Sequence, residues 1–251
     1  MPKKLKDYYN LQLAELLSEK IKREKKGFRS KNFIDQIRRG LRGREFLERQ
    51  DLFAEALEKE LDEDYSGALK LFTKILGPEL ETETGMFREG WWLWPIGRFV
   101  ERNAGTEPSK INESLDFIKE LTKRFTGEFA IRPLLEKYPK RSLSKLKSWS
   151  REPSVHVRRL SSEGIRIRLP WAKKLNLFKD YFEACYEILE HLKDSPEKFV
   201  QKSVGNNLND LFKEEPALAR KIVANWTRPP VSPQTLWILK HGQRWRRRSG
   251  H

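Results

Sequence analysis

The sequence contains a single cysteine, Cys185, among its 251 residues. One thiol cannot form an intramolecular disulfide, and such sparing use of cysteine is typical of proteins from a reducing compartment. There is also no run of about 18 apolar residues that could cross a membrane. The first residues, MPKKLKDYYNLQ, lack the apolar core of a secretory signal. We therefore expect a soluble, cytoplasmic protein that does not engage a membrane.

Alternating apolar and polar runs, which would predict β-strands, are missing as well. Leucine, lysine, glutamate and arginine are abundant instead, and these residues favour helices. One cysteine and four scattered histidines do not make a zinc site, and no glycine-rich phosphate loop is present. We expect an all-α protein that works without a metal ion or a cofactor.

The charge of the chain is strongly positive, because 51 lysine and arginine residues stand against 36 aspartate and glutamate residues, a net charge of +15. Such an excess, if it gathers on one face, indicates a polyanionic partner. The alternative is a solvated surface with dispersed lysines. Arginine, whose planar guanidinium can bind two phosphate oxygens at once, is concentrated around residues 38–44, 158–168 and 244–248. This clustering favours the polyanionic partner.

The chain is expected to form one continuous array of helices in four stretches. Residues 1–76 carry amphipathic patterns, such as Phe53, Leu57 and Leu61, and predict N-terminal helical repeats. Residues 77–108 predict a loop and an aromatic segment, WWLWP, that joins the halves. Its tryptophans would pack in a core or seam, or alternatively contact nucleic acid. Residues 109–245 predict further repeats, followed by a basic tail over 246–251.

A repeat in the second half is the most informative feature of this organisation. Four positions recur with the same spacing, first as Trp149, Pro153, Val157 and Leu160, then as Leu192, Pro196, Val200 and Ser203, and Trp226 and Pro230 begin a third copy. The copies start 43 and 34 residues apart, a spacing that resembles HEAT-type helix pairs. Ser195 is expected to cap the second helix of its pair, with Pro196 in the first helical position. Such pairs stack into a solenoid with a concave inner surface.

Three carboxylates fall at related positions of these repeats. Glu128 and Glu163 are 35 residues apart, about one repeat, and Asp210 follows 47 residues later, about one repeat plus the inserted segment 166–174. All three can therefore face one groove. The insertion is basic, contains a proline and presents Trp171, which is unlike a routine connection between helices.

The alternative is that these acids simply pair with Arg158, Arg159 or Arg166 between repeats. The stretch NNLN at 206–209 argues against it, because three asparagines in four residues are poor helix formers. Polar residues retained at such a cost indicate a functional site.

One reaction suits this set of residues. A purine alkylated at N3 or N7 is cationic and leaves its sugar as a neutral base, so no general acid is needed, in contrast to ordinary glycoside hydrolysis. The step needs negative charge near the oxocarbenium ion, a positioned water molecule and an aromatic face for the cationic base. Carboxylates and a tryptophan in a basic groove meet these needs. His156 could be a general base, but a lone histidine in a basic helix is more often structural.

The sequence resembles the AlkC branch of the AlkC/AlkD DNA alkylation repair glycosylases. The resemblance covers about residues 5–245, and its most specific part is HVRRLSSEG at 156–164 followed by RLPWA at 168–172. Other similar stretches are LTKRFT at 121–126, EFAIRP at 128–133, SV at 203–204, NLND at 207–210, WP at 94–95 and FVE at 99–101.

This resemblance implies a HEAT-like solenoid that holds duplex DNA in its concave face, as a monomer associated with the bacterial nucleoid. It implies removal of N-alkylated bases such as 3-methyladenine without full extraction of the lesion. Glu128, Glu163 and Asp210 would be catalytic, and Trp171 would contact the lesion. The cations expected to bind DNA are Arg158, Arg159, Arg166, Arg168, Lys173, Lys174, Arg246, Arg247 and Arg248.

The sequence departs from the family pattern in a few places. It has IRIR at 165–168, where the family often has Thr-Arg-Pro-Arg, which bears on the loop and on lesion preference. Gly205 stands where alanine is expected and would loosen its helix. The extra C-terminal immunoglobulin-like domain of some relatives is expected to be absent, with the basic tail contributing to DNA binding instead.

Two other functions remain open from the sequence. A HEAT-repeat protein could bind nucleic acid without catalysis, having kept the fold and lost turnover. A protein–protein scaffold is the commonest use of such solenoids, but a less one-sided charge would be expected of it.

Overall fold

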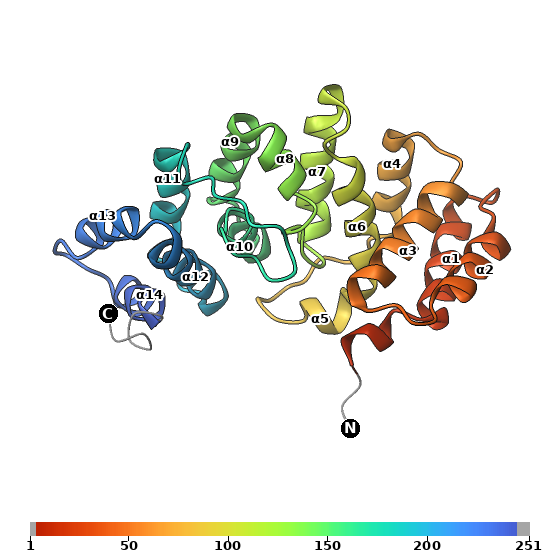
Figure 1. Ribbon diagram of the computed structural model, residues 1–251, viewed down its shortest axis with the longest axis horizontal. Coiled ribbons are helices and arrows are strands. Elements are labelled where there is room, and N and C mark those ends of the chain that lie inside the picture. The colour runs from red at the N-terminus through yellow and green to blue at the C-terminus, as the bar shows by residue number, and fades with distance from the viewer. Residues whose placement is uncertain (1–3, 245–251) are drawn as a thin grey trace. The chain divides into compact units, whose positions relative to one another are not determined.

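The computed structural model describes residues 4–244, and within this range it contains helices and no strands. The chain divides into two compact units, Met1–Pro133 and Leu134–His251 (Figure 1). The predicted all-α fold is confirmed. The predicted basic tail, with Arg246, Arg247 and Arg248, lies outside the described residues.

The first unit is built from helices that pack on a continuous apolar core. Its elements are η1 (Leu5–Tyr8), α1 (Leu11–Glu24), α2 (Ser30–Gly40), α3 (Phe46–Glu60), α4 (Tyr65–Ile75), α5 (Met86–Glu89), η2 (Trp91–Leu93), α6 (Trp94–Asn103), η3 (Pro108–Lys110) and α7 (Ile111–Thr122). Side chains begin some of these helices, since Asn10 accepts a hydrogen bond from the Leu13 N–H and Asp64 accepts one from the Gly67 N–H. The short helix α8 (Arg132–Lys137) contains the boundary between the units.

The aromatic segment at 91–95 belongs to the core of the first unit. Trp94 is buried, and its ring lies 4.7 Å from that of Phe46 and 5.5 Å from that of Phe125. Pro95 does not interrupt a helix here; it occupies the first turn of α6, where its missing N–H has no helical partner to lose. The stretch 77–108 thus contains a helix, α6, that packs on α3. Its role as a connection between halves stays a prediction.

The second unit contains three consecutive helix pairs, drawn in green to blue in Figure 1. They are α9 (Pro139–Trp149) with α10 (Val155–Glu163), α11 (Phe182–Leu192) with α12 (Lys198–Glu214), and α13 (Pro216–Trp226) with α14 (Pro233–Gly242). The first helix of each pair ends at the residue that opens each copy of the sequence repeat. The apolar positions of the repeat, including Val157, Leu160 and Val200, are fully buried, as stacked helix pairs require.

The prediction that Ser195 caps α12 is wrong. The N-cap residue is Glu197, two residues later, and the Ser195 hydroxyl donates to the Glu197 carboxylate at 2.6 Å. The repeated prolines, Pro153, Pro196 and Pro230, precede their helices. Their fixed φ suits the short connection inside each pair rather than the helix itself.

Helices α12 and α14 pack closely at two glycines. A Cβ atom on Gly242 would lie 2.6 Å from Cβ of Leu208, and one on Gly205 would lie 2.7 Å from Cδ2 of His241. Gly205 was expected to loosen its helix, but its missing side chain is what gives α14 room to approach. The helix pair therefore depends on small residues at the crossing.

We expect Gly242→Ala to lower the free energy of unfolding by about 1–3 kcal/mol, the usual cost of forcing an extra carbon into a packed core. Gly27→Ala is the matched control, because a Cβ atom there meets nothing within 4 Å. Urea unfolding followed by circular dichroism measures both. Equal stability of the two variants would contradict the close approach of α12 and α14.

Candidate functional site

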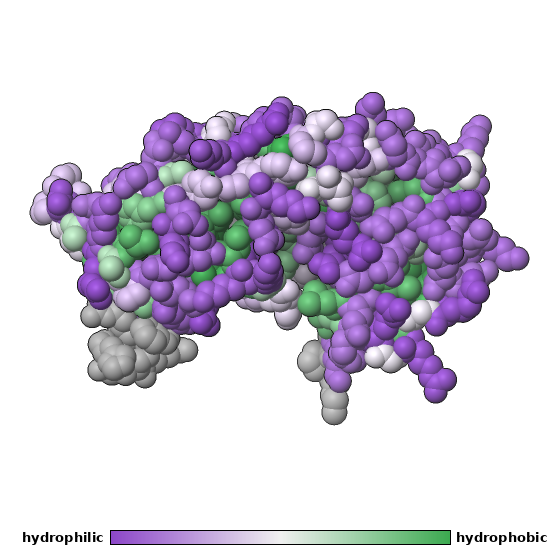
Figure 2. All heavy atoms as spheres, turned by 45° about the horizontal axis from the view of Figure 1, so that its top comes forward, coloured by the Kyte–Doolittle hydropathy of each residue, from purple (hydrophilic) through white to green (hydrophobic). Residues whose placement is uncertain are grey.

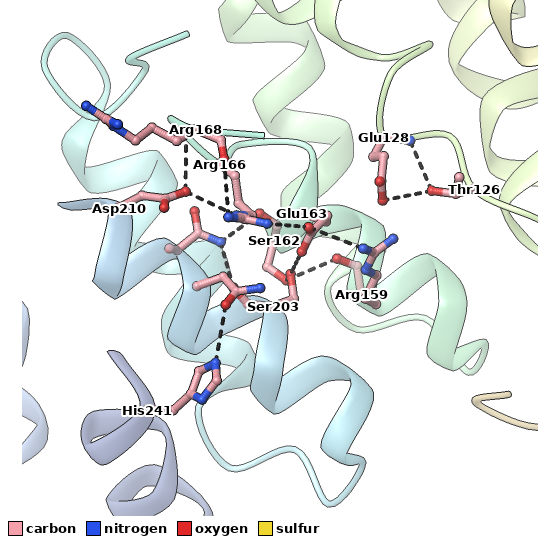
Figure 3. Close-up of polar contacts among 12 residues, drawn as sticks. Thr126, Glu128, Arg159, Ser162, Glu163, Arg166, Arg168, Ser203, Asp210 and His241 are labelled. Atoms are coloured by element: carbon pink, nitrogen blue, oxygen red, sulfur yellow. Dashed lines mark hydrogen bonds and ion pairs between the residues drawn. The ribbon is translucent and has the colours of Figure 1, made fainter. Parts of the chain in front are cut away.

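A buried arginine, Arg166, joins the first two helix pairs of the second unit. It follows α10 and its guanidinium makes three hydrogen bonds, shown in Figure 3. Nη1 donates to Oε1 of Glu163 at 2.8 Å, Nε donates to Oδ2 of Asp210 at 3.1 Å, and Nη2 donates to the carbonyl of Arg168 at 3.2 Å. Arg166 is only 8% exposed. One cation therefore holds two of the predicted catalytic carboxylates, from α10 and α12, at a fixed separation.

Glu163 is enclosed by donors on both of its oxygens. Besides Arg166, Nη2 of Arg159 lies 3.2 Å from Oε1, and the Ser203 hydroxyl donates to Oε2 at 2.6 Å. Burial raises the pKa of the Glu163 carboxyl, but the positive charges of Arg159 and Arg166 outweigh it and hold the pKa below its ordinary value. Glu163 is therefore a fixed negative charge at neutral pH, with little capacity to bind anything further.

Asp210 differs from Glu163 because one of its oxygens is unused. Oδ2 accepts hydrogen bonds from Nε of Arg166 and, at 3.2 Å, from the backbone N–H of Arg168. The Oδ1 atom accepts no hydrogen bond from residues 4–244. It is also not fully enclosed by them, so it can accept a hydrogen bond from outside. The side chain as a whole is buried, at 2% exposure. Asp210 is thus rigidly held on one side and able to accept a hydrogen bond on the other.

Serine and asparagine side chains lock α10 to α12 beneath the carboxylates. The Ser162 and Ser203 hydroxyls lie 2.7 Å apart, and Nδ2 of Asn207 donates to the carbonyl of Ser162 at 2.8 Å and to that of Ser203 at 3.1 Å. These contacts explain why α12 keeps Asn207 in spite of its poor helix propensity. They also give Ser162 and Ser203 a place in the site; the sequence analysis included both in motifs but assigned neither a role.

Trp171 lies on the loop between α10 and α11. The loop is anchored by the buried side chains of Ile165, Ile167 and Leu169, and by a backbone hydrogen bond from Leu175 to Ile167 at 3.2 Å. Trp171 itself is 58% exposed and has a φ of 64°. A left-handed conformation is unfavourable for a bulky side chain, and such strain is most often kept at functional sites. The loop therefore presents an aromatic face from a firmly held base.

Three of the cations predicted to bind DNA are engaged within the protein. Arg158 bonds the carboxylate of Glu197 and the carbonyl of Pro153, Arg159 lies 4.9 Å from the ring centre of Phe199, and Arg166 is buried as described above. The alternative that the acids pair with arginines is therefore realised for Glu163 and Asp210. Direct contact of these three arginines with DNA is not favoured by their positions. Arg159 and Arg166 support the predicted carboxylates instead, and Arg158 pairs with Glu197.

The other described cations lie at the surface. The side chains of Lys173, Lys174 and Arg168 are 82%, 54% and 54% exposed. Lys173 pairs with Glu136 at 2.7 Å, and the other two pair with Glu214. Exposed pairs of this kind are weak, commonly worth less than about 1 kcal/mol, so a phosphate can replace the carboxylate. Their contact with DNA stays a prediction.

Glu128, the third predicted carboxylate, belongs to the first unit. Its Oε2 accepts a hydrogen bond from the Thr126 hydroxyl at 2.9 Å, and its backbone N–H donates to the same oxygen of Thr126 at 3.4 Å. The turn needs Gly127, because a Cβ atom there would lie 2.6 Å from side-chain atoms of Ile118 and Thr122. This turn fixes the carboxylate close to the backbone.

His156, considered above as a general base, is packed in the interior. It is 2% exposed and its ring lies 5.5 Å from that of Phe199, which supports the structural interpretation. Among the described residues no group of three or more histidine, cysteine, aspartate or glutamate side chains is arranged to hold a metal ion. No helix in the same part of the chain is long and apolar enough to span a bilayer.

Fold and site together define a helical-repeat protein whose helix pairs are joined by a buried arginine–carboxylate network. The family model of DNA alkylation repair enzymes matches residues 116–250, more than half of the chain, and the chain belongs to this family. This result confirms the resemblance detected in the sequence.

Individual relatives agree with this assignment. The chain is 32% identical over 241 residues to the uncharacterized protein YhaZ of Bacillus subtilis, which covers 96% of this chain and 64% of that protein. Among solved structures it is similar to the alkylpurine DNA glycosylase AlkC of Pseudomonas fluorescens, bound to DNA containing an abasic site analog. The TM-score is 0.83 at 28% identity, over 97% of this chain and 65% of that one. AlkD2 of Streptococcus mutans shares the fold, with a TM-score of 0.51 at 19% identity, over 86% of this chain and 97% of that one. The chain thus spans slightly less than two thirds of the length of YhaZ and AlkC.

We expect Arg166→Ala to destabilise the second unit by about 3–5 kcal/mol, because it leaves two buried carboxylates without their shared cation. Arg168→Ala is the matched control, since it removes an exposed ion pair from the same loop and keeps the backbone N–H that binds Asp210; its effect should stay below about 1 kcal/mol. Chemical unfolding at pH 7 compares the two. A similar small loss in both variants would show that Arg166 does not hold the network together.

Proposed function

We propose that this protein is a DNA glycosylase that releases cationic N-alkylated bases, of the 3-methyladenine type, from duplex DNA. The observation that carries the proposal is the similarity to AlkC over 97% of this chain, together with the buried carboxylates Glu163 and Asp210 at the positions the sequence motif assigned to catalysis. The protein acts without a cofactor, as a monomer.

The geometry supports a division of labour between the two buried acids. Asp210, with a free Oδ1, stabilises the positive charge that develops on the sugar and orients the attacking water. Glu163 has no free capacity and acts through Arg166, by holding that guanidinium against Asp210. Glu128 is assigned to the same reaction on the strength of the sequence resemblance alone.

The distribution of charge supports a polyanionic substrate. The first unit, residues 1–133, contains 26 lysine and arginine residues against 24 aspartate and glutamate residues, and the second, residues 134–251, contains 25 against 12. The positive excess therefore belongs almost entirely to the unit that carries Glu163, Trp171 and Asp210. Binding through Arg168, Lys173 and Lys174 would be independent of sequence and sensitive to salt.

A protein that binds nucleic acid without catalysis is the second candidate. One observation favours it: both oxygens of Glu163 are occupied by hydrogen-bond donors from within the protein. A purely structural ion-pair network would show the same arrangement. The behaviour of Asp210 distinguishes the two candidates, because a structural network gives its free oxygen no role.

Asp210→Asn should reduce single-turnover release of methylated base from duplex DNA by about a hundred- to a thousandfold, the effect expected on losing one transition-state charge contact. Affinity for methylated duplex should be kept, because the ground state uses this charge little. Asp180→Asn, at an exposed position of the same unit, is the control and should release base at the wild-type rate. Wild-type release by Asp210→Asn would eliminate the carboxylate mechanism and favour the non-catalytic candidate.

Trp171→Ala should slow base release more than it weakens binding to undamaged duplex, because the indole face is proposed to contact the cationic base, an interaction worth about 1–2 kcal/mol when desolvated. Trp171→Phe should restore part of the loss, since it keeps an aromatic face. Release and binding are measured on the same folded samples. Equal losses on damaged and undamaged duplex would make Trp171 a general DNA contact or a structural residue.

A further inference from the structure

A strip of basic and aromatic side chains runs along α12 and α14 of the second unit. We call it the α12–α14 strip, and its members are Lys198, Lys202 and Asn206 on α12, Trp237 and His241 on α14, and Arg244, two residues beyond the end of α14. The three α12 residues are spaced four apart and share one side of the helix. Asp210 continues the same spacing, one helical turn beyond Asn206, an axial rise of about 6 Å.

The members of the strip hold one another through stacking and through one amide. Nζ of Lys198 lies 4.1 Å from the ring centre of Trp237, and the Trp237 and His241 rings stack at 4.8 Å with an angle of 12°. Nη2 of Arg244 donates to the Oδ1 atom of Asn206 at 2.8 Å. The same Oδ1 atom lies 3.2 Å from Nε2 of His241, the contact drawn as a dashed line from His241 in Figure 3. Because arginine can only donate, the amide atom there is an acceptor, so Nε2 of His241 carries a proton. The other ring nitrogen, Nδ1, is then the basic one.

The strip differs from the rest of the second unit in having no acidic residue. No aspartate or glutamate occurs at residues 198–209 or 233–244. Lys198, Lys202 and Lys240 form no ion pair with the described residues, whereas the lysines and arginines near Trp171 pair with Glu136 or Glu214. Hydrophilic residues cover much of the face shown in Figure 2, so the presence of charged side chains does not by itself distinguish the strip from the rest of the surface. Lysines that form no ion pair with the described residues are able to bind an anion from outside.

We propose that the α12–α14 strip is a subsite for the phosphodiester backbone of duplex DNA. This inference rests on the proposed function and deepens it, by assigning where the strand beside the lesion is held. Lys202, Arg244 and His241 contact phosphate oxygens, while Trp237 and Asn206 hold the cations in place. Gly205 belongs to the subsite as well, because a Cβ atom there would lie 2.7 Å from Cδ2 of the His241 ring and displace it.

His241 makes the subsite sensitive to pH. Burial, and then the positive charges of Arg244 and Lys202, lower the pKa of His241 to about 4, so the free protein holds it neutral at pH 7. The groups that face it are Gly205, Asn206 and Lys202 from α12, Trp237 from α14 and Arg244 just beyond α14, none of them acidic. A phosphate that shares these cations favours the imidazolium and raises the pKa in the complex. Protonation of His241 therefore increases the affinity for phosphate. This increase is fully present below the pKa that His241 has in the free protein, and it is lost as the pH rises through the pKa that His241 has in the complex.

Binding of a labelled, undamaged duplex tests the subsite by fluorescence anisotropy across a salt series at pH 7.5. Lys202→Gln should weaken binding severalfold and reduce the slope of log K against log[salt] by about 0.9, the contribution of one phosphate contact. Lys221→Gln is the matched control, because Lys221 lies on α13 in the same unit and pairs with Glu183 at 3.1 Å; its slope should equal that of the wild type.

The second measurement repeats the binding at pH 5 and pH 7.5. Wild-type protein should gain more affinity at pH 5 than His241→Gln does, by about tenfold for each unit by which the pKa in the complex exceeds that pH. His191→Gln is the control, since His191 also lies beside an arginine, with Nε2 2.6 Å from Nη2 of Arg151, but on α11. Carboxylates that titrate at pH 5 affect all three proteins alike and cancel in the comparison.

The outcomes separate the subsite from the proposed function. If the wild type binds no duplex and releases no base, the proposed function is wrong and the subsite falls with it. If the wild type does both, but Lys202→Gln and His241→Gln behave as their controls, only the subsite is wrong. Tight binding of inorganic phosphate alone, by calorimetry, would overturn the assignment to DNA in favour of a free-anion site. Lys202 is exposed, so its variant remains informative even if His241→Gln unfolds.

Discussion

The site of this protein depends on one buried cation. Arg166 binds Glu163 from α10 and Asp210 from α12, and it is too well enclosed for water to replace either partner. Burying an ion pair is costly, and an apolar pair of the same size would commonly be at least as stable. The network therefore serves to position groups rather than to stabilise the fold. It keeps the negative charge of Asp210, with its free Oδ1 atom, at a fixed place in a strongly basic unit.

The serines and asparagines around this cation complete that device. The Ser203 hydroxyl and the Arg159 guanidinium take up the remaining capacity of Glu163, and Asn207 ties the backbones of α10 and α12 together. The same residues would look like defects if they were judged by helix propensity or by burial alone. Their cost is offset in part, because the Ser203 hydroxyl and the Nδ2 group of Asn207 donate to the adjoining helix pair, whereas the buried Oδ1 atoms of Asn207 and Asn209 accept no hydrogen bond from the described residues.

Much of the fold could be predicted from the sequence, because helix pairs repeat their apolar positions and Trp149, Leu192 and Trp226 mark the end of the first helix in each pair. The N-cap of α12 could not be predicted, since serine is by preference the better cap and the helix nevertheless begins after Glu197. The three carboxylates could be chosen by register and by resemblance. The sequence could not predict which of the carboxylates has a free oxygen. This depends on hydrogen-bond donors such as the Ser203 hydroxyl, which reaches Glu163 from 40 positions away in the chain. The same holds for the partnership of Asn206 and His241.

The uneven division of charge has a consequence for how the protein would meet its substrate. The second unit has 13 more basic than acidic residues, and the first unit has only two more. A long polyanion attracts the two units very unequally over a Debye length of about 8 Å at physiological ionic strength. Under the proposed function, diffusional encounters with DNA would then favour the second unit, which carries the carboxylates. The nearly neutral first unit would add little to this attraction, so that composition biases the encounter before any specific contact has formed.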